Sequence, residues 1–185
     1  MLAFTPTEMK QLRRLNTPAK IQDFLNTLPF NFERAGETLR SPRRVLRDRT
    51  AHCLEGALLA AAALQLHGEA PLLLDLKTDS RGGDSDHVVA LFRRRGLWGA
   101  ISKTNHAVLR YREPVYRTVR ELALSYFHEY FLDTGAKTLR SYSKPFDLRR
   151  VAKRGLPDVG LSRGRWQAGW PTDERDLWWL SKMLD

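Results

Sequence analysis

The longest apolar run of the chain extends from Cys53 to Leu66 and is interrupted only by Glu55 and Gln65. A helix formed by this run is apolar on nearly every side, which is typical of a helix in the middle of a domain. Thr50 is the expected N-cap and Gly68 the expected stop. The run is shorter than the roughly 20 apolar residues that a membrane-spanning helix needs, so we expect no membrane span.

Three shorter helices are expected before this run. Thr7 to Leu15 mixes polar and apolar residues, and Thr17-Pro18 and Ser41-Pro42 each combine a capping side chain with a proline, which fits the first position of a helix. The second helix has its apolar residues at the three- and four-residue spacing of one helical face; these are Ile21, Phe24, Leu25 and Leu28.

Extended segments follow the apolar run. Strands are expected at 71–76, 87–92 and 97–102, the last two joined by a turn at 93–96, with a polar loop over 77–84. The segment 117–131 has the pattern of an amphipathic helix, and 138–142 is a candidate last strand. This order predicts an α+β fold in which a buried helix packs on an antiparallel sheet.

The C-terminal segment differs in composition from the rest. It contains four of the five Trp residues of the chain, and a final short helix is expected from Thr172 to Met183. We expect these rings to pack on the core. The chain is then one domain with a helical section over 1–48, a core over 49–142 and a basic, Trp-rich tail over 143–185.

Composition limits the compartment and the partners. A single Cys excludes a disulfide framework within the chain, and Met1 to Pro6 show no secretory pattern, so we expect a cytoplasmic protein. The chain carries 31 Lys and Arg against 21 Asp and Glu, a net charge of +10. Such a charge favours acidic partners, but no nucleic-acid-binding motif accompanies it, so only weak, non-specific nucleic-acid binding is expected.

Cys53 is the main candidate for chemistry. Near the start of a helix the backbone N–H groups are unpaired and the helix dipole is positive, which favours a thiolate. The alternative is a buried Cys that packs as a small hydrophobic residue. His87 follows a polar loop and begins a strand, where its ring can reach the end of a neighbouring helix. Cys53 and His87 therefore form a candidate nucleophile and base.

The context of this pair resembles the transglutaminase-like superfamily, which has the papain-type fold. The similar segments are Arg49 to Leu64 around the cysteine, Asp86 to Ala90 around the histidine, and Trp98 to Thr104 on the next strand. The resemblance extends over roughly Ser41 to Thr104. It implies a papain-like α+β fold and a catalytic Cys53 and His87, with a third residue at position 102.

The third residue departs from the family, because Ser102 stands where the family has Asp. A serine hydroxyl can accept a hydrogen bond from the His87 ring but carries no charge. Asn105 is the papain-like type of orienting residue and needs a turn after Ser102 to face His87. We favour Asn105 slightly over Ser102, and we expect at least a Cys53–His87 dyad.

Two functions follow from these residues. The first is cysteine-dependent acyl transfer at an amide of a peptide or protein, as a peptidase, amidase or transferase, with no cofactor and no metal. The second is a catalytically degenerate domain that acts as a basic protein- or nucleic-acid-binding module. Neither reading sets the oligomeric state.

Overall fold

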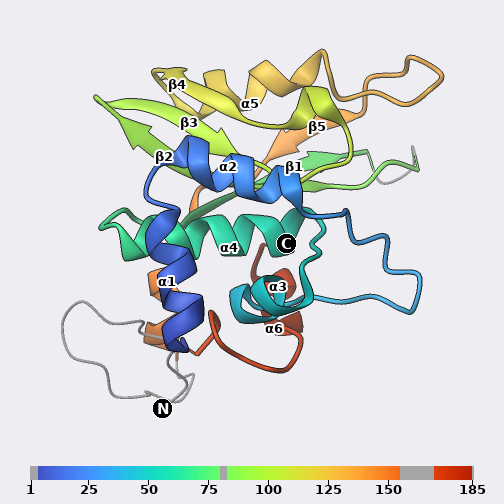
Figure 1. Cartoon of the computed structure of the whole chain (residues 1–185). Helices are drawn as coiled ribbons and strands as arrows, with labels where there is room; N and C mark the ends of the chain where they lie inside the picture. Colours follow the sequence, from blue (N-terminus) through green and yellow to red (C-terminus); the bar gives the residue numbers. More distant parts are fainter. Residues whose placement is uncertain (1–3, 80–82, 155–168, 185) are drawn as a thin grey trace.

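A computed structural model of the chain describes residues 4–79, 83–154 and 169–184. It is a mixed α+β structure with six α-helices and an antiparallel sheet in its described part (Figure 1). The helices are α1 Pro6–Arg14, α2 Pro18–Thr27, α3 Pro42–Asp48, α4 Cys53–Leu66, α5 Val119–Phe127 and α6 Trp178–Leu184. The strands are β1 Leu72–Thr78, β2 His87–Arg94, β3 Leu97–Ile101, β4 Arg112–Tyr116, β5 Leu139–Tyr142 and β6 Phe146–Asp147.

The sheet has the strand order β4-β3-β2-β1-β5. The short strand β6 also pairs with β1, at Leu72 and Leu73, whereas β5 pairs with the other end of β1. The β1–β2 register places Leu76 opposite His87, so the histidine lies at the very end of the paired region. The predicted strands at 71–76, 87–92, 97–102 and 138–142 correspond to β1, β2, β3 and β5. Strand β4 was not predicted; it contains Pro114, which an edge strand tolerates because one side of it forms no ladder.

Both faces of the sheet are buried. Val88, Ala90 and Phe92 of β2 belong to the hydrophobic cluster that includes α4, whereas Val89 and Leu91 belong to the cluster that includes α5. Because successive side chains of a strand point to opposite faces, a strand covered on both sides is apolar at every position. This explains the continuous apolar run of β2.

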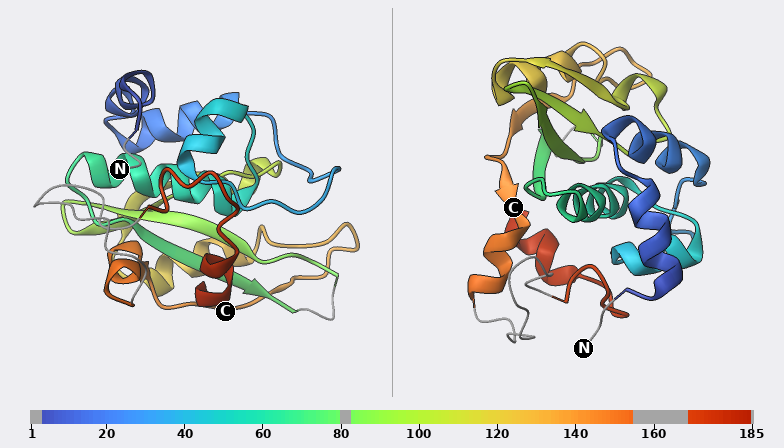
Figure 2. Two further views of the ribbon diagram at one scale, coloured as in Figure 1. Left: turned by 90° about the horizontal axis from the view of Figure 1, so that it is seen from below. Right: turned by 60° about the vertical axis from the view of Figure 1, so that its left-hand side comes forward.

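The central helix α4 lies between the sheet and helices α1 and α3, as the view nearly along its axis shows (Figure 2, right), whereas α5 lies on the opposite face of the sheet. Every residue from Leu54 to Leu64 is buried, which confirms the predicted buried helix. The predicted start is wrong, however. The helix begins at Cys53 with His52 in the N-cap position, so Thr50 does not cap it.

The expected helix starts before α2 and α3 are confirmed. The side-chain oxygens of Thr17 and Ser41 accept hydrogen bonds from the backbone N–H groups of Lys20 and Arg44 at 3.2 and 3.3 Å. Thr5 caps α1 in the same way. These caps set the direction in which each helix leaves its loop.

The C-terminal segment packs on the same cluster as α4, through Trp170, Leu177 and Leu180. Helix α6 begins at Trp178 rather than at Thr172. Of the other tail tryptophans, Trp179 is partly buried against the cluster, and Trp166 lies outside the described residues. Trp178 is 42% exposed, so the expectation that the tail rings pack on the core is wrong for this residue. No helix in the described part of the chain has the length and apolar character needed to cross a membrane.

Candidate active site

Cys53 is the first residue of α4. His52 before it has extended backbone angles (φ −91°, ψ −172°), so the helical conformation starts at the cysteine itself. The first-turn N–H groups of a helix have no partner within that helix and form the positive end of its dipole. The thiol therefore lies closer to this positive end than it would with the expected N-cap, Thr50.

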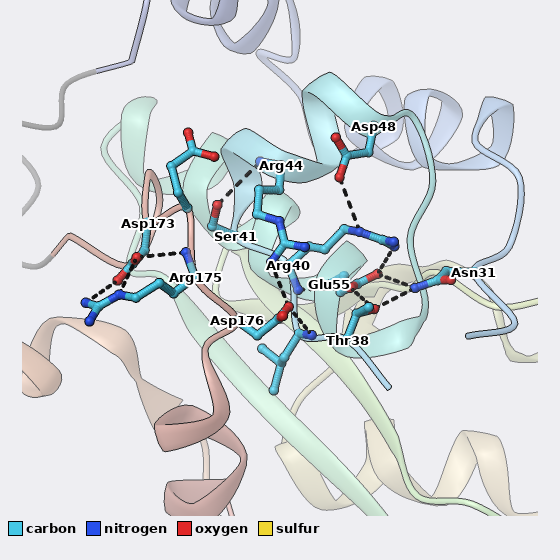
Figure 3. Close-up of polar contacts among 12 residues, drawn as sticks. Asn31, Thr38, Arg40, Ser41, Arg44, Asp48, Glu55, Asp173, Arg175 and Asp176 are labelled. Carbon is cyan, nitrogen blue, oxygen red and sulfur yellow. Dashed lines mark hydrogen bonds and ion pairs between the residues drawn. The ribbon is translucent and has the colours of Figure 1, made fainter. Parts of the chain in front are cut away.

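A buried carboxylate holds the start of α4 in place. Glu55 is fully buried, and its Oε2 accepts a hydrogen bond from the backbone N–H of His52 at 3.0 Å. Its Oε1 accepts from the Thr38 hydroxyl at 2.8 Å and from the backbone N–H of Arg40 at 2.9 Å, as Figure 3 partly shows. The Arg40 guanidinium lies 3.6 Å from Oε2. Glu55 thus both neutralises an arginine and stabilises the first turn.

His87 and Ser102 meet at the end of the sheet. His87 opens β2 and Ser102 follows the last residue of β3, and both are buried. The His87 Nε2 lies 2.6 Å from the Ser102 Oγ. Because Nε2 is engaged by the hydroxyl, Nδ1 is the ring nitrogen left for a proton exchanged with Cys53.

Asn105 does not make this contact. It is exposed and lies on the wall of the cavity in front of Cys53, whereas the hydrogen-bond partner of His87 is Ser102. The preference for Asn105 is therefore corrected. The chain does turn after Ser102, with Thr104 Oγ1 accepting from the His106 N–H, but this turn directs Asn105 outward.

Two imidazoles act on the thiol. Burial raises the pKa of Cys53, but hydrogen bonding to His52 and then to His87, together with the charges of both rings, lowers the pKa to about 5. Burial lowers the pKa of His52, whereas hydrogen bonding to Cys53 and the charge of Glu55 raise the pKa to about 9. At neutral pH the site therefore holds a thiolate beside an imidazolium.

His52 was not expected from the sequence to serve the cysteine. Its Nε2 lies 2.9 Å from the carbonyl oxygen of Thr38, and because a carbonyl only accepts, Nε2 carries a proton. The same nitrogen is 3.6 Å from the Glu55 Oε1. The signal available in the sequence was its position directly before the nucleophile with Glu55 three residues later, the spacing of a capping box.

Cys53 and His87 open into a cavity of about 380 Å³. Its walls come from four segments that are distant in sequence, namely Phe30 and Phe32, 84–87, 104–109 and 129–133. The loops carrying the first, second and last of these extend from the same side of the molecule, on the right in Figure 1. Cys53 is therefore accessible from the cavity and is partly exposed.

No arrangement of three or more His, Cys, Asp or Glu side chains suited to a metal ion occurs among the described residues. The site therefore consists of Cys53, His52, His87 and Ser102, with Glu55 behind them.

No protein-family model matches this chain, and the search of curated proteins returned no relative.

Proposed function

We propose that the protein is a cysteine-dependent acyl transferase or hydrolase of the papain and transglutaminase type, acting at an amide carbonyl. The observation that carries the proposal is the contact of the buried His87 with Ser102 in a cavity that also contains Cys53, the first residue of a helix. A nucleophile, a base and a group that orients the base are the minimum set for this chemistry.

In the first half-reaction the Cys53 thiolate attacks the carbonyl carbon, and the carbonyl π electrons move to oxygen. The N–H groups of the first turn of α4 can donate hydrogen bonds to this oxyanion. When the tetrahedral intermediate collapses, the C–N bond breaks, and His87 gives the leaving amine the proton that its ring took from the Cys53 thiol before the attack. The product is a thioester on Cys53.

In the second half-reaction water or an amine attacks the thioester. His87 removes the proton of the attacking group, and the Cys53 thiolate leaves as the new acyl bond forms. Water gives hydrolysis, and an amine gives transfer. His52 stabilises the thiolate at the start and the end of the cycle through its positive charge.

Formation of the thioester tests the proposal directly. We expect p-nitrophenyl acetate to release a burst of nitrophenol equal to the enzyme concentration, and mass spectrometry to find one acetyl group on Cys53. Because Cys53 is the single cysteine of the chain, Cys53→Ala removes every thiol and should abolish both signals. Absence of a burst and of an adduct in the folded protein would favour the binding module instead.

A further inference from the structure

The entrance of the active-site cavity is lined by exposed apolar side chains. Phe32, Val108 and Phe131 are 59%, 47% and 51% exposed, and all three lie on its walls. Burial of such side chains by a partner is favourable in proportion to the apolar area removed from water. These residues form an apolar rim around the opening to Cys53.

The same walls are acidic, although the chain as a whole carries a net charge of +10. Four carboxylates line the cavity, and no Lys or Arg does so within the described residues; the carboxylates are Asp84, Asp86, Glu129 and Asp133. Only Glu129 is paired, with Arg112 at 2.5 Å. The described residues provide no ion pair for the other three. The Lys137 ammonium, which does not line the cavity, covers one face of the Phe131 ring at 4.5 Å from its centroid.

Neutral groups fix two of these unpaired carboxylates in place. The Asp86 Oδ1 accepts from the backbone N–H and the hydroxyl of Thr78, and the Asp84 Oδ2 accepts from the Thr138 hydroxyl. Such donors orient a carboxylate without cancelling its charge. The cavity therefore presents a fixed negative field beside an apolar rim, which is complementary to a cation attached to an apolar chain.

We propose that the acyl donor is a polypeptide segment in which a basic side chain, held by Asp84, Asp86 and Asp133, neighbours an apolar side chain packed on Phe32, Val108 and Phe131. This inference rests on the proposed acyl chemistry at Cys53 and adds the class of its substrate. The acidic walls disfavour anionic substrates, including nucleic acid, at this cavity.

Charged thiol reagents measure the field at Cys53 directly, because the chain has no other cysteine. We expect trimethylammonioethyl methanethiosulfonate to modify the protein roughly tenfold faster than its sulfonatoethyl counterpart, after division by the rates with a free thiol. The double variant Asp84→Asn/Asp133→Asn should lower this ratio severalfold. Asp23→Asn, an exposed carboxylate of α2 outside the cavity, is the matched control and should leave the ratio unchanged.

Peptide binding then tests the substrate class without any turnover. Fluorescence anisotropy should show that the Cys53→Ala variant binds a labelled peptide of lysines and leucines. It should show no binding of the same peptide with glutamates in place of the lysines. Asp84→Asn/Asp133→Asn should weaken the first complex about tenfold, and Phe32→Ser should weaken it as well. Equal binding of both peptides would overturn the inference.

The outcomes separate the two proposals. A thiolate that is acylated but shows no preference for the cationic reagent overturns the substrate class and leaves the acyl chemistry standing. A charge preference at a thiol that forms no acyl adduct supports the acidic cavity but rejects the enzyme. A preference that persists in the double variant rejects the assigned carboxylates.

Discussion

The Gln22 side chain forms two hydrogen bonds with the backbone of Ser102, as a neighbouring strand would. The Gln22 amide donates to the Ser102 carbonyl at 2.8 Å and accepts from the Ser102 N–H at 3.0 Å, and both residues are buried. The two bonds continue the pairing of β3 past its last residue. They fix the backbone of Ser102 and so direct its hydroxyl at His87.

The first prediction follows from this clamp. Ser102→Ala should lower kcat for p-nitrophenyl acetate hydrolysis by about ten- to a hundredfold, because the His87 ring loses the partner that orients it. Asn105→Ala removes an exposed side chain with no bond to His87 and should stay within about twofold of the parent. Equal losses in both variants would contradict the assigned role of Ser102.

The thiolate depends on His52 as well as on His87. His52 sits between the buried Glu55 and the thiol, so a positive charge on its ring is favoured from both sides. Glu33 Oε1 lies a further 3.9 Å from the His52 Nε2. Glu55 and Glu33 thus place negative charge beside His52, whereas the group that contacts the His87 ring is the neutral Ser102 hydroxyl.

The second prediction concerns pH. Alkylation by iodoacetamide needs the thiolate, so its rate should rise with pH and reach half of its maximum near pH 5, the lowered pKa of Cys53. His52→Gln keeps a donor for the Thr38 carbonyl but removes the charge, so it should shift the profile to higher pH. His128→Gln, at an exposed site, is the control. A parent profile centred near the ordinary thiol pKa of about 8.5 would reject the ion pair.

At the scale of elements, α4 is crossed closely by the chain that leaves β3. A Cβ on Gly56 would lie 2.2 Å from the Cβ of Lys103, which no ordinary contact allows. The Lys103 Nζ continues past the helix and donates to the carbonyl oxygens of Leu25 and Leu28, at the C-terminal end of α2. Gly56 thus allows Lys103 to link β3 to α2 one turn from the nucleophile.

The third prediction concerns Gly56→Ala, where helix propensity and the contact with Lys103 change the free energy of unfolding in opposite directions. In a free helix, Ala in place of Gly stabilises by about 1 kcal/mol. Against Lys103 the added methyl group forces the backbone apart, so Gly56→Ala should instead lower the free energy of unfolding by about 1–3 kcal/mol. Urea denaturation measures this change in the free energy of unfolding. Gly169→Ala, where nothing lies within 4 Å of the new Cβ, should show no such loss.

At the scale of the whole molecule, the C-terminal segment is joined to the N-terminal helices. The Asp176 Oδ1 accepts from the Leu39 backbone N–H at 2.8 Å and from the Arg44 guanidinium at 2.7 Å (Figure 3). The next residue, Leu177, donates its N–H to the Leu39 carbonyl. Since Arg40 and Thr38 beside Leu39 hold Glu55, this junction supports the loop behind the active site.

The fourth prediction tests whether the tail is part of the core. Leu180 is fully buried, so Leu180→Ala should lower the free energy of unfolding by about 2–5 kcal/mol. Trp178 is 42% exposed, and Trp178→Ala should cost less than about 1 kcal/mol despite the larger side chain. The reverse order, measured by urea denaturation, would show that the tail does not dock as described.

The sequence alone determined most of the local elements, though not β4 or the starts of α4 and α6, and it identified the residues with reactive side chains. Ser-Pro and Thr-Pro steps marked helix starts, a run apolar on all sides marked the buried α4, and the short apolar runs after it marked strands of an antiparallel sheet. These predictions succeed because caps, periodicity and burial are properties of neighbouring positions. Cys53 and His87 stood out for the same reason, since each lies at the end of a regular element.

Only the tertiary structure decided which distant groups meet. Ser102 rather than Asn105 reaches His87 because Gln22, eighty positions earlier, holds the end of β3. His52 becomes a partner of the thiol because Thr38 and Glu55 enclose its ring. The walls of the acidic cavity come from four segments that lie far apart in the sequence, and their spacing does not indicate that they meet. Each of these results depends on strand register and helix placement, which no local pattern encodes.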